Sequence, residues 1–452
     1  MSHLLPGPAN DAAAAGAERP TRVRYAVVWL LFLATTVNYA DRATLSIAGP
    51  LLSKDLDLDP VAMGYVFSAF GWAYVLAQVP GGWLLDRFGS KRVYVASVAI
   101  WSVVTLLQGF VGLLTAAVAT VVLFVLRFLL GIAEAPSFPG NSRIVAAWFP
   151  TAERGTASAI FNSAQYFALV LFSPIMGWIT HALSWAHVFF FMGALGLALA
   201  VLFAKKVHAP RDDPRANAAE LSYIEQGGGL VGLDEARTAA AASRPRWSDV
   251  RQLLGSRMLV GVYVGQYCIT TLTYFFLTWF PVYLVEGRGM SILKVGFVAS
   301  LPALCGFFGG VLGGVFSDGL LRRGYSLTAA RKTPIVAGML LSVSMIGCNY
   351  VDTQWAVIAI MALAFFGKGI GALGWAVVSD TSPRRIAGLS GAVFNTFGNT
   401  AAITTPIVIG YLVKGTGQFA SALVFVGANA VVAILSYLLV VGEIKRLEID
   451  NA

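Results

Sequence analysis

Apolar runs of about 18 residues or more recur along nearly the whole chain, and they restrict its possible folds more than any other feature does. A helix of that length crosses about 30 Å of hydrocarbon. Because lipid offers no hydrogen-bond partner to the backbone, the runs must be helical, and the roughly 10-residue alternation of a membrane β-barrel does not occur. Only 12% of the 452 residues are charged, about half of the share in a soluble domain. A soluble enzyme, a coiled coil, a disulfide scaffold and a disordered chain are therefore excluded.

The hydropathy pattern predicts an all-α membrane protein with about twelve transmembrane helices. The predicted spans cover residues 25–48, 63–85, 93–114, 116–148, 156–183, 186–203, 258–284, 295–316, 334–351, 355–379, 388–413 and 419–441. We expect two six-helix bundles, 25–204 and 258–441, joined by a polar central loop, 205–257, with room for one surface helix. Residues 1–24 are predicted to be a disordered tail without a removable signal, and 442–452 a short C-terminal tail.

Basic residues are distributed unevenly between the loops on the two sides. If both termini are cytoplasmic, the outer loops carry four of the 32 Lys and Arg residues, namely Lys54, Arg288, Lys294 and Lys414. Three more lie inside spans, and the remaining 25 are on the inner side. Because positively charged loops stay in the cytoplasm, this distribution predicts cytoplasmic termini. The net charge of +9 is then a topology signal and no indication of nucleic-acid binding.

The two predicted bundles repeat one another in sequence. GGWLLDRFGSKR after the second span resembles GGVFSDGLLRR after the eighth, and this match pairs Asp86 with Asp318. GTASAIFNS and GLSGAVFNT match independently and pair Asn162 with Asn395, at the same offset to within one residue. Because six crossings return the chain to the same side, the halves have the same orientation. This parallel duplication is typical of the major facilitator fold, whose substrate site lies near the midplane between the halves.

Five charged residues fall inside predicted spans, where each costs at least about 2.5 to 3.5 kcal/mol. Asp41 and Arg42 lie in the first span, Arg127 and Glu134 in the fourth, and Lys368 in the tenth. Arg127 and Glu134 are two helical turns apart and so face the same way. Ion pairs that only fix helix packing are the alternative explanation. The five charges leave a surplus cation, which favours an anionic substrate.

Polar and aromatic residues accompany these charges on other spans: Tyr39, Tyr74, Gln78, Gln165, Tyr274, Trp375 and Asn395. Any one of them alone is more typical of helix packing or of an interfacial aromatic belt than of a binding site. Together with the charges they predict a substrate-binding cavity. Pro136 and Pro139, in APSFP of the fourth span, are expected to kink that helix.

The loop after the second span carries a separate cluster of charges, Asp86, Arg87, Lys91 and Arg92. Its glycines allow close helix approach, and its Asp and Arg can pair with a neighbouring helix end. We expect this cluster to act in gating, as a latch that has to break for inward opening. A basic loop that only determines topology is the alternative.

Several stretches resemble the anion:cation symporter branch of the major facilitator superfamily, and most closely the bacterial D-glucarate/galactarate:proton symporters. They include NYADRATLSIAG, RFLLGIAEAPSFPGNSRIVAAWFP, YFFLTWFPVYL, MALAFFGKGIGALGWAVVSDTSP and GLSGAVFNTFGN. The resemblance implies that Asp41 and Glu134 are protonation sites. It also implies substrate contacts for Arg42, Tyr74, Arg127, Gln165, Trp375 and Asn395. Tyr274 and Lys368 are added from their position among the polar residues of the spans.

The tenth span departs from the related galactonate symporters, in which an Asn stands at the position of Lys368. Because Lys368 precedes Ala372 by one turn, we expect both on one helix face, with Lys368 pairing with the second carboxylate of an aldaric acid. The predicted function is uptake of a sugar-acid dianion with protons at a bacterial inner membrane, by a monomer without a cofactor or metal. Galactonate, a hexuronate or an aromatic carboxylate remain alternative substrates. The spans contain no catalytic motif, which disfavours a membrane enzyme. Duplicated halves around buried charges favour alternating access over a channel.

Overall fold

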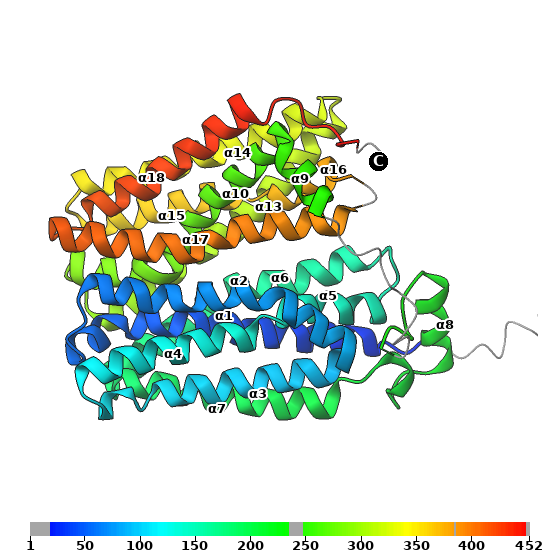
Figure 1. The fold of residues 1–452 in the computed structure, drawn as a ribbon, viewed down its shortest axis with the longest axis horizontal. Coiled ribbons are helices and arrows are strands. Elements are labelled where there is room, and N and C mark those ends of the chain that lie inside the picture. The colour runs from blue at the N-terminus through cyan, green and yellow to red at the C-terminus, as the bar shows by residue number, and fades with distance from the viewer. Residues whose placement is uncertain (1–18, 235–246, 384–385, 449–452) are drawn as a thin grey trace, which may run out of the picture.

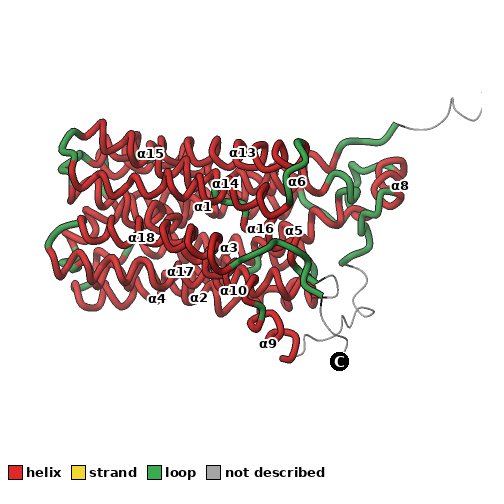
Figure 2. Tube along the Cα trace, turned by 90° about the horizontal axis from the view of Figure 1, so that it is seen from above, coloured by secondary structure: helices red, strands yellow, loops and turns green. Residues whose placement is uncertain are grey.

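The computed structural model describes residues 19–234, 247–383 and 386–448. Within these ranges the chain is built of helices and loops without strands (Figure 2). Twelve helices are long and apolar enough to cross a membrane, which confirms the predicted number. The helices run along the long axis of the molecule, and the two halves of the chain form separate bundles side by side (Figure 1). The predicted all-α fold of two six-helix halves is therefore confirmed.

The N-terminal half begins at Val23, two residues before the predicted first span. Its helices are α1 (Val23–Asp55), α2 (Pro60–Phe88), α3 (Ser90–Gln108) with the 3₁₀ turn η1 (Val111–Leu113), α4 (Ala116–Glu134), α5 (Ser137–Trp148), α6 (Arg154–Ala182) and α7 (Trp185–Lys206). The fourth span is divided between α4 and α5 at Ala135 and Pro136. The break lies where Pro136 was expected to kink this span. Proline interrupts a helix because it has no backbone N–H to donate.

The C-terminal half repeats this arrangement with more interruptions. Its elements are α10 (Arg257–Tyr274), η3 (Phe275–Trp279), α11 (Phe280–Val282), η4 (Tyr283–Gly287), α12 (Ile292–Val298), α13 (Ser300–Arg322), α14 (Leu327–Val343), η5 (Ser344–Tyr350), α15 (Gln354–Ile370), α16 (Gly374–Thr381), α17 (Ala387–Thr416), α18 (Ala420–Leu435) and η7 (Ser436–Val440). The turns η3, η4 and η7 are π-helical. The tenth span breaks between α15 and α16, so Ala372 lies outside both helices. The expectation that Lys368 and Ala372 share one helix face is therefore wrong.

The central segment carries two short helices among the described residues, not one. They are α8 (Ala218–Gln226) and α9 (Trp247–Gly255), and a 3₁₀ turn, η2 (Pro210–Asp212), precedes them. Both helices and the described C-terminal end lie at one end of the bundles, which we call the terminal side (Figure 1). We call the opposite end the loop side. The predicted tails fall mainly on residues 1–18 and 449–452, which lie outside the described residues.

The segment around α8 is fastened to the N-terminal half. The buried carboxylate of Glu220 accepts hydrogen bonds from the backbone amides of Val23 and Arg24, at 3.1 and 3.2 Å. It also pairs with the guanidinium of Arg24 at 3.1 Å. Glu220 thus caps the exposed first turn of α1, where the amides have no helical partner and a negative charge is stabilised.

The two halves approach each other most closely on the loop side. A Cβ added to Gly64 of α2 would lie 2.6 Å from the carbonyl oxygen of Pro406 in α17, and one on Gly177 of α6 would lie 2.8 Å from the Cα atom of Gly296 in α12. Both helix pairs therefore depend on glycine for their close packing. A Cβ added to Gly82, nearer the terminal side of α2, meets no atom within 4 Å. The halves thus separate toward the terminal side.

Candidate functional site

The N-terminal half contains a buried ion pair between its first and fourth spans. Arg42 Nε donates to Glu134 Oε2 at 2.8 Å, and both side chains are almost completely buried. The Arg42 guanidinium also lies 4.8 Å from the ring centre of Tyr39, 4.7 Å from that of Phe70 and 4.9 Å from that of Tyr74. Aromatic faces stabilise a desolvated guanidinium. Arg42, Glu134 and Tyr74 are thus brought together as predicted, although one Glu134 oxygen and one Arg42 nitrogen, Nη2, have no partner among the described protein atoms.

Arg127 also lies near the Phe70 ring, and it forms no ion pair among the described residues. Its guanidinium is 5.7 Å from that ring centre, and its Nε and Nη1 atoms make no hydrogen bond to a described protein atom. The side chain is 3% exposed. A buried guanidinium with free donors is suited to an anion, because five N–H groups in a planar fork match a carboxylate.

Asp41 does not join the Arg42–Glu134 pair by a hydrogen bond. Both of its carboxylate oxygens are buried without a hydrogen-bond partner among the described residues. Its carboxylate interacts with the indole N–H of Trp101 in α3, outside hydrogen-bond geometry. Asp41, Arg42, Arg127 and Glu134 are close enough to interact electrostatically with one another. Of the five predicted charges, Lys368 is the one outside this group.

Lys368, in α15, is the one predicted interior charge that lies in the C-terminal half. It is 6% exposed, and its Nζ atom lies 5.1 Å from the ring centre of Phe365 and 6.0 Å from that of Tyr166 in α6. Among the described residues, no carboxylate lies within ion-pair distance of it. An ammonium group buried without an acidic partner is costly unless a ligand supplies the negative charge.

A polar contact joins the halves between these charges and the terminal side. Asn395 Nδ2 donates to Gln78 Oε1 at 3.0 Å, and Asn395 Oδ1 accepts from Asn399 Nδ2 at 3.0 Å. The Tyr274 hydroxyl lies 3.5 Å from Asn399 Oδ1. Two of the predicted substrate residues, Asn395 and Tyr274, are therefore linked through Asn399. In the described part of the chain, no side-chain hydrogen bond between the halves lies closer to the terminal side than this one.

Two other predicted residues, Gln165 and Trp375, have accessible side chains. Gln165 is half-buried and donates to the carbonyl of Asn162 on its own helix at 3.1 Å. Trp375 is 55% exposed and packs edge-on against Phe394 at 5.0 Å between ring centres. Neither contacts the buried charges, so a role in substrate binding stays a prediction for both.

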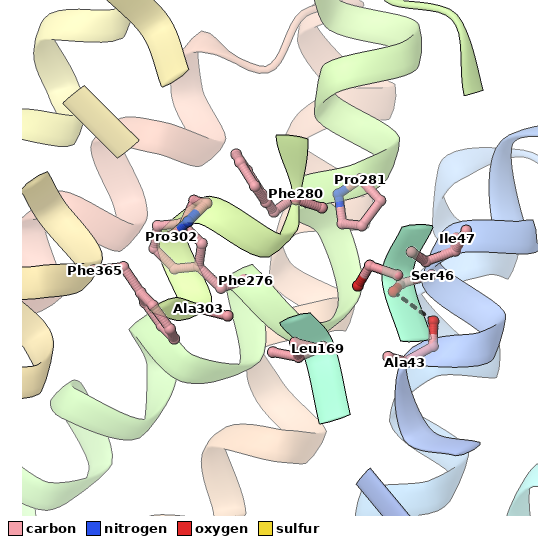
Figure 3. A pocket seen from close by; sticks show the side chains of 12 residues that line it. Ala43, Ser46, Ile47, Leu169, Phe276, Phe280, Pro281, Pro302, Ala303 and Phe365 are labelled. Carbon is pink, nitrogen blue, oxygen red and sulfur yellow. Dashed lines mark hydrogen bonds between the residues drawn. The ribbon is translucent and has the colours of Figure 1, made fainter. Parts of the chain in front are cut away.

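On the loop side, the space between the halves is reduced to a cavity of about 10 Å³. Figure 3 shows Ser46 and Leu169 on one side of it and Phe276, Phe280 and Phe365 on the other. A cavity of this volume holds about one water molecule. A sugar acid therefore does not fit into this cavity.

The predicted gating cluster makes its contacts within the N-terminal half. Asp86 pairs with Arg143 of α5 at 2.5 Å, and Arg87 lies over the ring of Trp83 at 5.1 Å. Lys91 and Arg92 form no ion pair within the described ranges. A gating role for this cluster stays a prediction.

Sequence reasoning missed several residues of the site. Phe70 lies near both arginines, Asn399 links Tyr274 to Asn395, and Tyr166 lies beside Lys368. Phe70 and Asn399 each lie four residues from a predicted residue on the same helix, Tyr74 and Asn395, so spacing could have identified them. Tyr166 and Trp101 carried no comparable signal.

The comparisons with known proteins agree with this geometry. Residues 31–330 match the Major Facilitator Superfamily. The chain belongs to this superfamily. It is 66% identical to a Bacillus subtilis protein named as a probable galactarate/D-glucarate transporter, over 95% of this chain and 94% of that one. An Escherichia coli K12 protein with the same descriptive name is 63% identical over 97% of each chain.

The fold of this major facilitator protein also matches solved structures. The crystal structure of a bacterial homologue of the human lysosomal transporter Spinster superposes with a TM-score of 0.73 at 15% identity, over 93% of this chain and 97% of that one. The chain is thus a multi-pass membrane transporter, and the predicted family resemblance is confirmed. The prediction that it is not an enzyme is confirmed by the same relatives.

Proposed function

We propose that this transporter imports a six-carbon sugar diacid, D-glucarate or galactarate, together with protons across a bacterial inner membrane. The terminal side faces the cytoplasm, and a single chain carries out transport by alternating opening of its two halves. The observation that carries the proposal is Lys368, a buried cation without an acidic partner in the half opposite Arg42 and Arg127. The names of the similar proteins described above support the same substrates.

The charges of the site suit a substrate with two carboxylates. An arginine of the N-terminal half binds one carboxylate with paired hydrogen bonds, and Lys368 binds the other. Arg127 has free donors for this purpose, and Arg42 gains them when Glu134 is neutralised. A monoanion leaves one of these cations without a partner.

Import of a dianion requires a coupled cation. At a membrane potential of 100 mV, negative inside, two negative charges enter against about 4.6 kcal/mol. Two protons make the step electroneutral, and the spans provide two buried carboxylates, Asp41 and Glu134. Proton binding at both is therefore the simplest stoichiometry for accumulation.

The Arg42–Glu134 pair provides the coupling. Protonation of Glu134 from the loop side removes the charge that holds Arg42, so that Arg42 can bind substrate. Release of that proton on the terminal side restores the pair at 2.8 Å and displaces the substrate. The structure, closed on the loop side with the pair formed, corresponds to the state after release. Coupling then arises because the two protonation states differ in affinity for the anion.

Uptake of labelled D-glucarate into proteoliposomes tests the proposal. The assay uses an inward proton gradient without sodium and is challenged with excess galactarate or galactonate. We expect saturable accumulation that a protonophore abolishes and that galactarate competes more strongly than galactonate. Accumulation competed mainly by galactonate or a hexuronate favours the second candidate, a sugar monoacid. Uptake that is neither saturable nor concentrative contradicts symport and indicates a channel.

A further inference from the structure

Helix α3 carries several polar side chains on the face that is buried within the N-terminal half. Tyr94, Trp101, Thr105 and Gln108 form a stripe among them, beside three buried serines and three buried valines, and the exposed side chains include Ile100, Val103 and Leu107. Spacings of seven, four and three residues keep the polar side chains on one face. Unbonded polar groups inside a bilayer are costly, so hydrophobic packing alone does not account for this stripe.

Three residues of the stripe have polar atoms without a protein partner. The indole Nε1 of Trp101, the hydroxyl of Thr105 and the Oε1 atom of Gln108 make no hydrogen bond to a described protein atom. All three side chains are at most 1% exposed. Buried polar groups are satisfied in the great majority of cases, by protein or by ordered water. Ordered water is the other kind of partner open to these atoms.

Thr105 lacks the intrahelical hydrogen bond that several buried threonines of the spans make, as does Thr405. Thr36, Thr44 and Thr180 each donate to the carbonyl oxygen four residues earlier in the same helix, at 2.7 to 3.0 Å. Ser102, next to Trp101, donates to the carbonyl of Val98 in the same way at 2.6 Å. The Thr105 hydroxyl makes no such bond and is free for another partner.

The stripe leads from the loop side to Asp41. Gln108 is the last residue of α3, and Phe110, two residues further on, is 46% exposed. At the other end, the Trp101 indole N–H faces the carboxylate of Asp41. The charged groups that act on Asp41 are Arg127 and Glu134 of α4, and neither pairs with it directly. Among the residues that the structure describes, the unbonded polar atoms of α3 between Asp41 and the loop side are thus those of the stripe.

We propose that Trp101, Thr105 and Gln108, bridged by water, form a proton path between the loop side and Asp41, separate from the substrate route between the halves. This inference rests on the proposed function, in which Asp41 is a proton site. One helical turn rises about 5.4 Å, a separation that a single water can bridge. A proton arrives on water as hydronium, and the Asp41 carboxylate accepts it and leaves a neutral water. Trp101 can only donate, so it orients the carboxylate while water carries the proton.

Replacement of Thr105 tests the path. Thr105→Val removes the hydroxyl and keeps the branched shape of the side chain. We expect D-glucarate uptake driven by a proton gradient to fall about a hundredfold, the lower end for removal of a proton-transfer group, while counterflow exchange at equal pH stays close to wild type. Thr105→Ser restores the hydroxyl and should restore driven uptake. Ser102→Ala is the matched control, because that hydroxyl bonds its own helix, and it should leave both activities unchanged.

Three results overturn the proton path. They are unchanged driven uptake in Thr105→Val, a loss that Thr105→Ser does not restore, and an equal loss of driven uptake and counterflow. Gln108→Leu provides a second variant if Thr105→Val is not monodisperse on gel filtration, with the same expectation. Wild-type protein that exchanges D-glucarate without accumulating it under a proton gradient overturns the proposed proton coupling as well. If wild type and Thr105→Val both accumulate D-glucarate normally under a proton gradient, only the proton path is overturned.

Discussion

Arg42 Nε and Glu134 Oε2 are 2.8 Å apart in the interior of the N-terminal half, and this contact joins the predicted substrate ligand to the predicted proton site. Neither residue has a second charged partner within ion-pair distance among the described residues. Breaking a buried pair by removing one charge costs about 3 to 5 kcal/mol when the other stays unpaired. The charge on Glu134 therefore determines whether Arg42 is available to an anion.

Replacement of Glu134 by Gln mimics its protonated form permanently. We expect Glu134→Gln to abolish accumulation driven by a proton gradient and to preserve counterflow exchange of D-glucarate. Both activities are measured in proteoliposomes. Glu286→Gln, a carboxylate on the loop side without an ion pair, is the control and should keep both activities. Intact pH-driven accumulation in Glu134→Gln would refute the coupling role.

Lys368 is expected to discriminate between diacids and monoacids. Hydrogen bonds to charged groups contribute about 1.5 to 3 kcal/mol, so Lys368→Asn should reduce D-glucarate uptake by about ten- to a hundredfold. Galactonate uptake should change much less, because a monoacid has no second carboxylate. The measurement is the ratio of the two initial rates, with Lys332→Asn as the control for loss of a lysine elsewhere. Equal losses for both substrates would remove Lys368 from diacid recognition.

The number and class of the helices could be predicted because hydropathy over a span does not depend on its neighbours. The interior charges were equally visible, since an ionisable residue in an apolar run stands out wherever the helix packs. Even the division of the fourth span followed from Pro136, whose ring constrains the backbone locally. These features need no knowledge of tertiary contacts.

The partners of the charges depend on helix rotation and could not be predicted in the same way. Arg42 faces Glu134, whereas Asp41, one residue earlier, faces Trp101. Helical periodicity indicates that neighbouring residues diverge, but it does not indicate which of them faces the cavity. The break after Ile370 was also missed, because GIGALG combines glycines that end a helix with a run still apolar enough to continue it.

Glu220 is expected to stabilise the folded protein rather than transport. Its buried carboxylate caps α1 and pairs with Arg24, so Glu220→Ala leaves two amides without their partner and removes one of the two carboxylates, Glu153 being the other, that bind the Arg24 guanidinium. We expect a loss of about 3 kcal/mol of stability, seen as a lower unfolding temperature in detergent. Glu225→Ala removes an exposed carboxylate of the same helix and should change stability by less than about 1 kcal/mol. Similar unfolding temperatures for the two variants would contradict the capping role.

The last prediction concerns the loop-side contact between Lys414 and Asp59, which joins the two halves at 2.7 Å. Both side chains are about half exposed, so the pair stabilises loop-side closure by only about 0.2 to 1 kcal/mol. Asp59→Asn should therefore shift the conformational equilibrium toward loop-side opening by less than about fivefold. Spin-label distances across the loop side measure this shift. Glu443→Gln, in an exposed pair within one half, is the control.

The pH dependence of this contact follows from the pKa of Asp59. The hydrogen bond from Lys414, followed by that from the amide of Ala62, holds the pKa of the Asp59 carboxyl below its usual value. A lowered pKa means that the pair contributes fully above the ordinary value of about 3.9 and is lost only as the pH falls through the lowered pKa. Between pH 5 and 8 the effect of Asp59→Asn should therefore be constant. If the effect changed within that range, another titrating group would have to control loop-side closure.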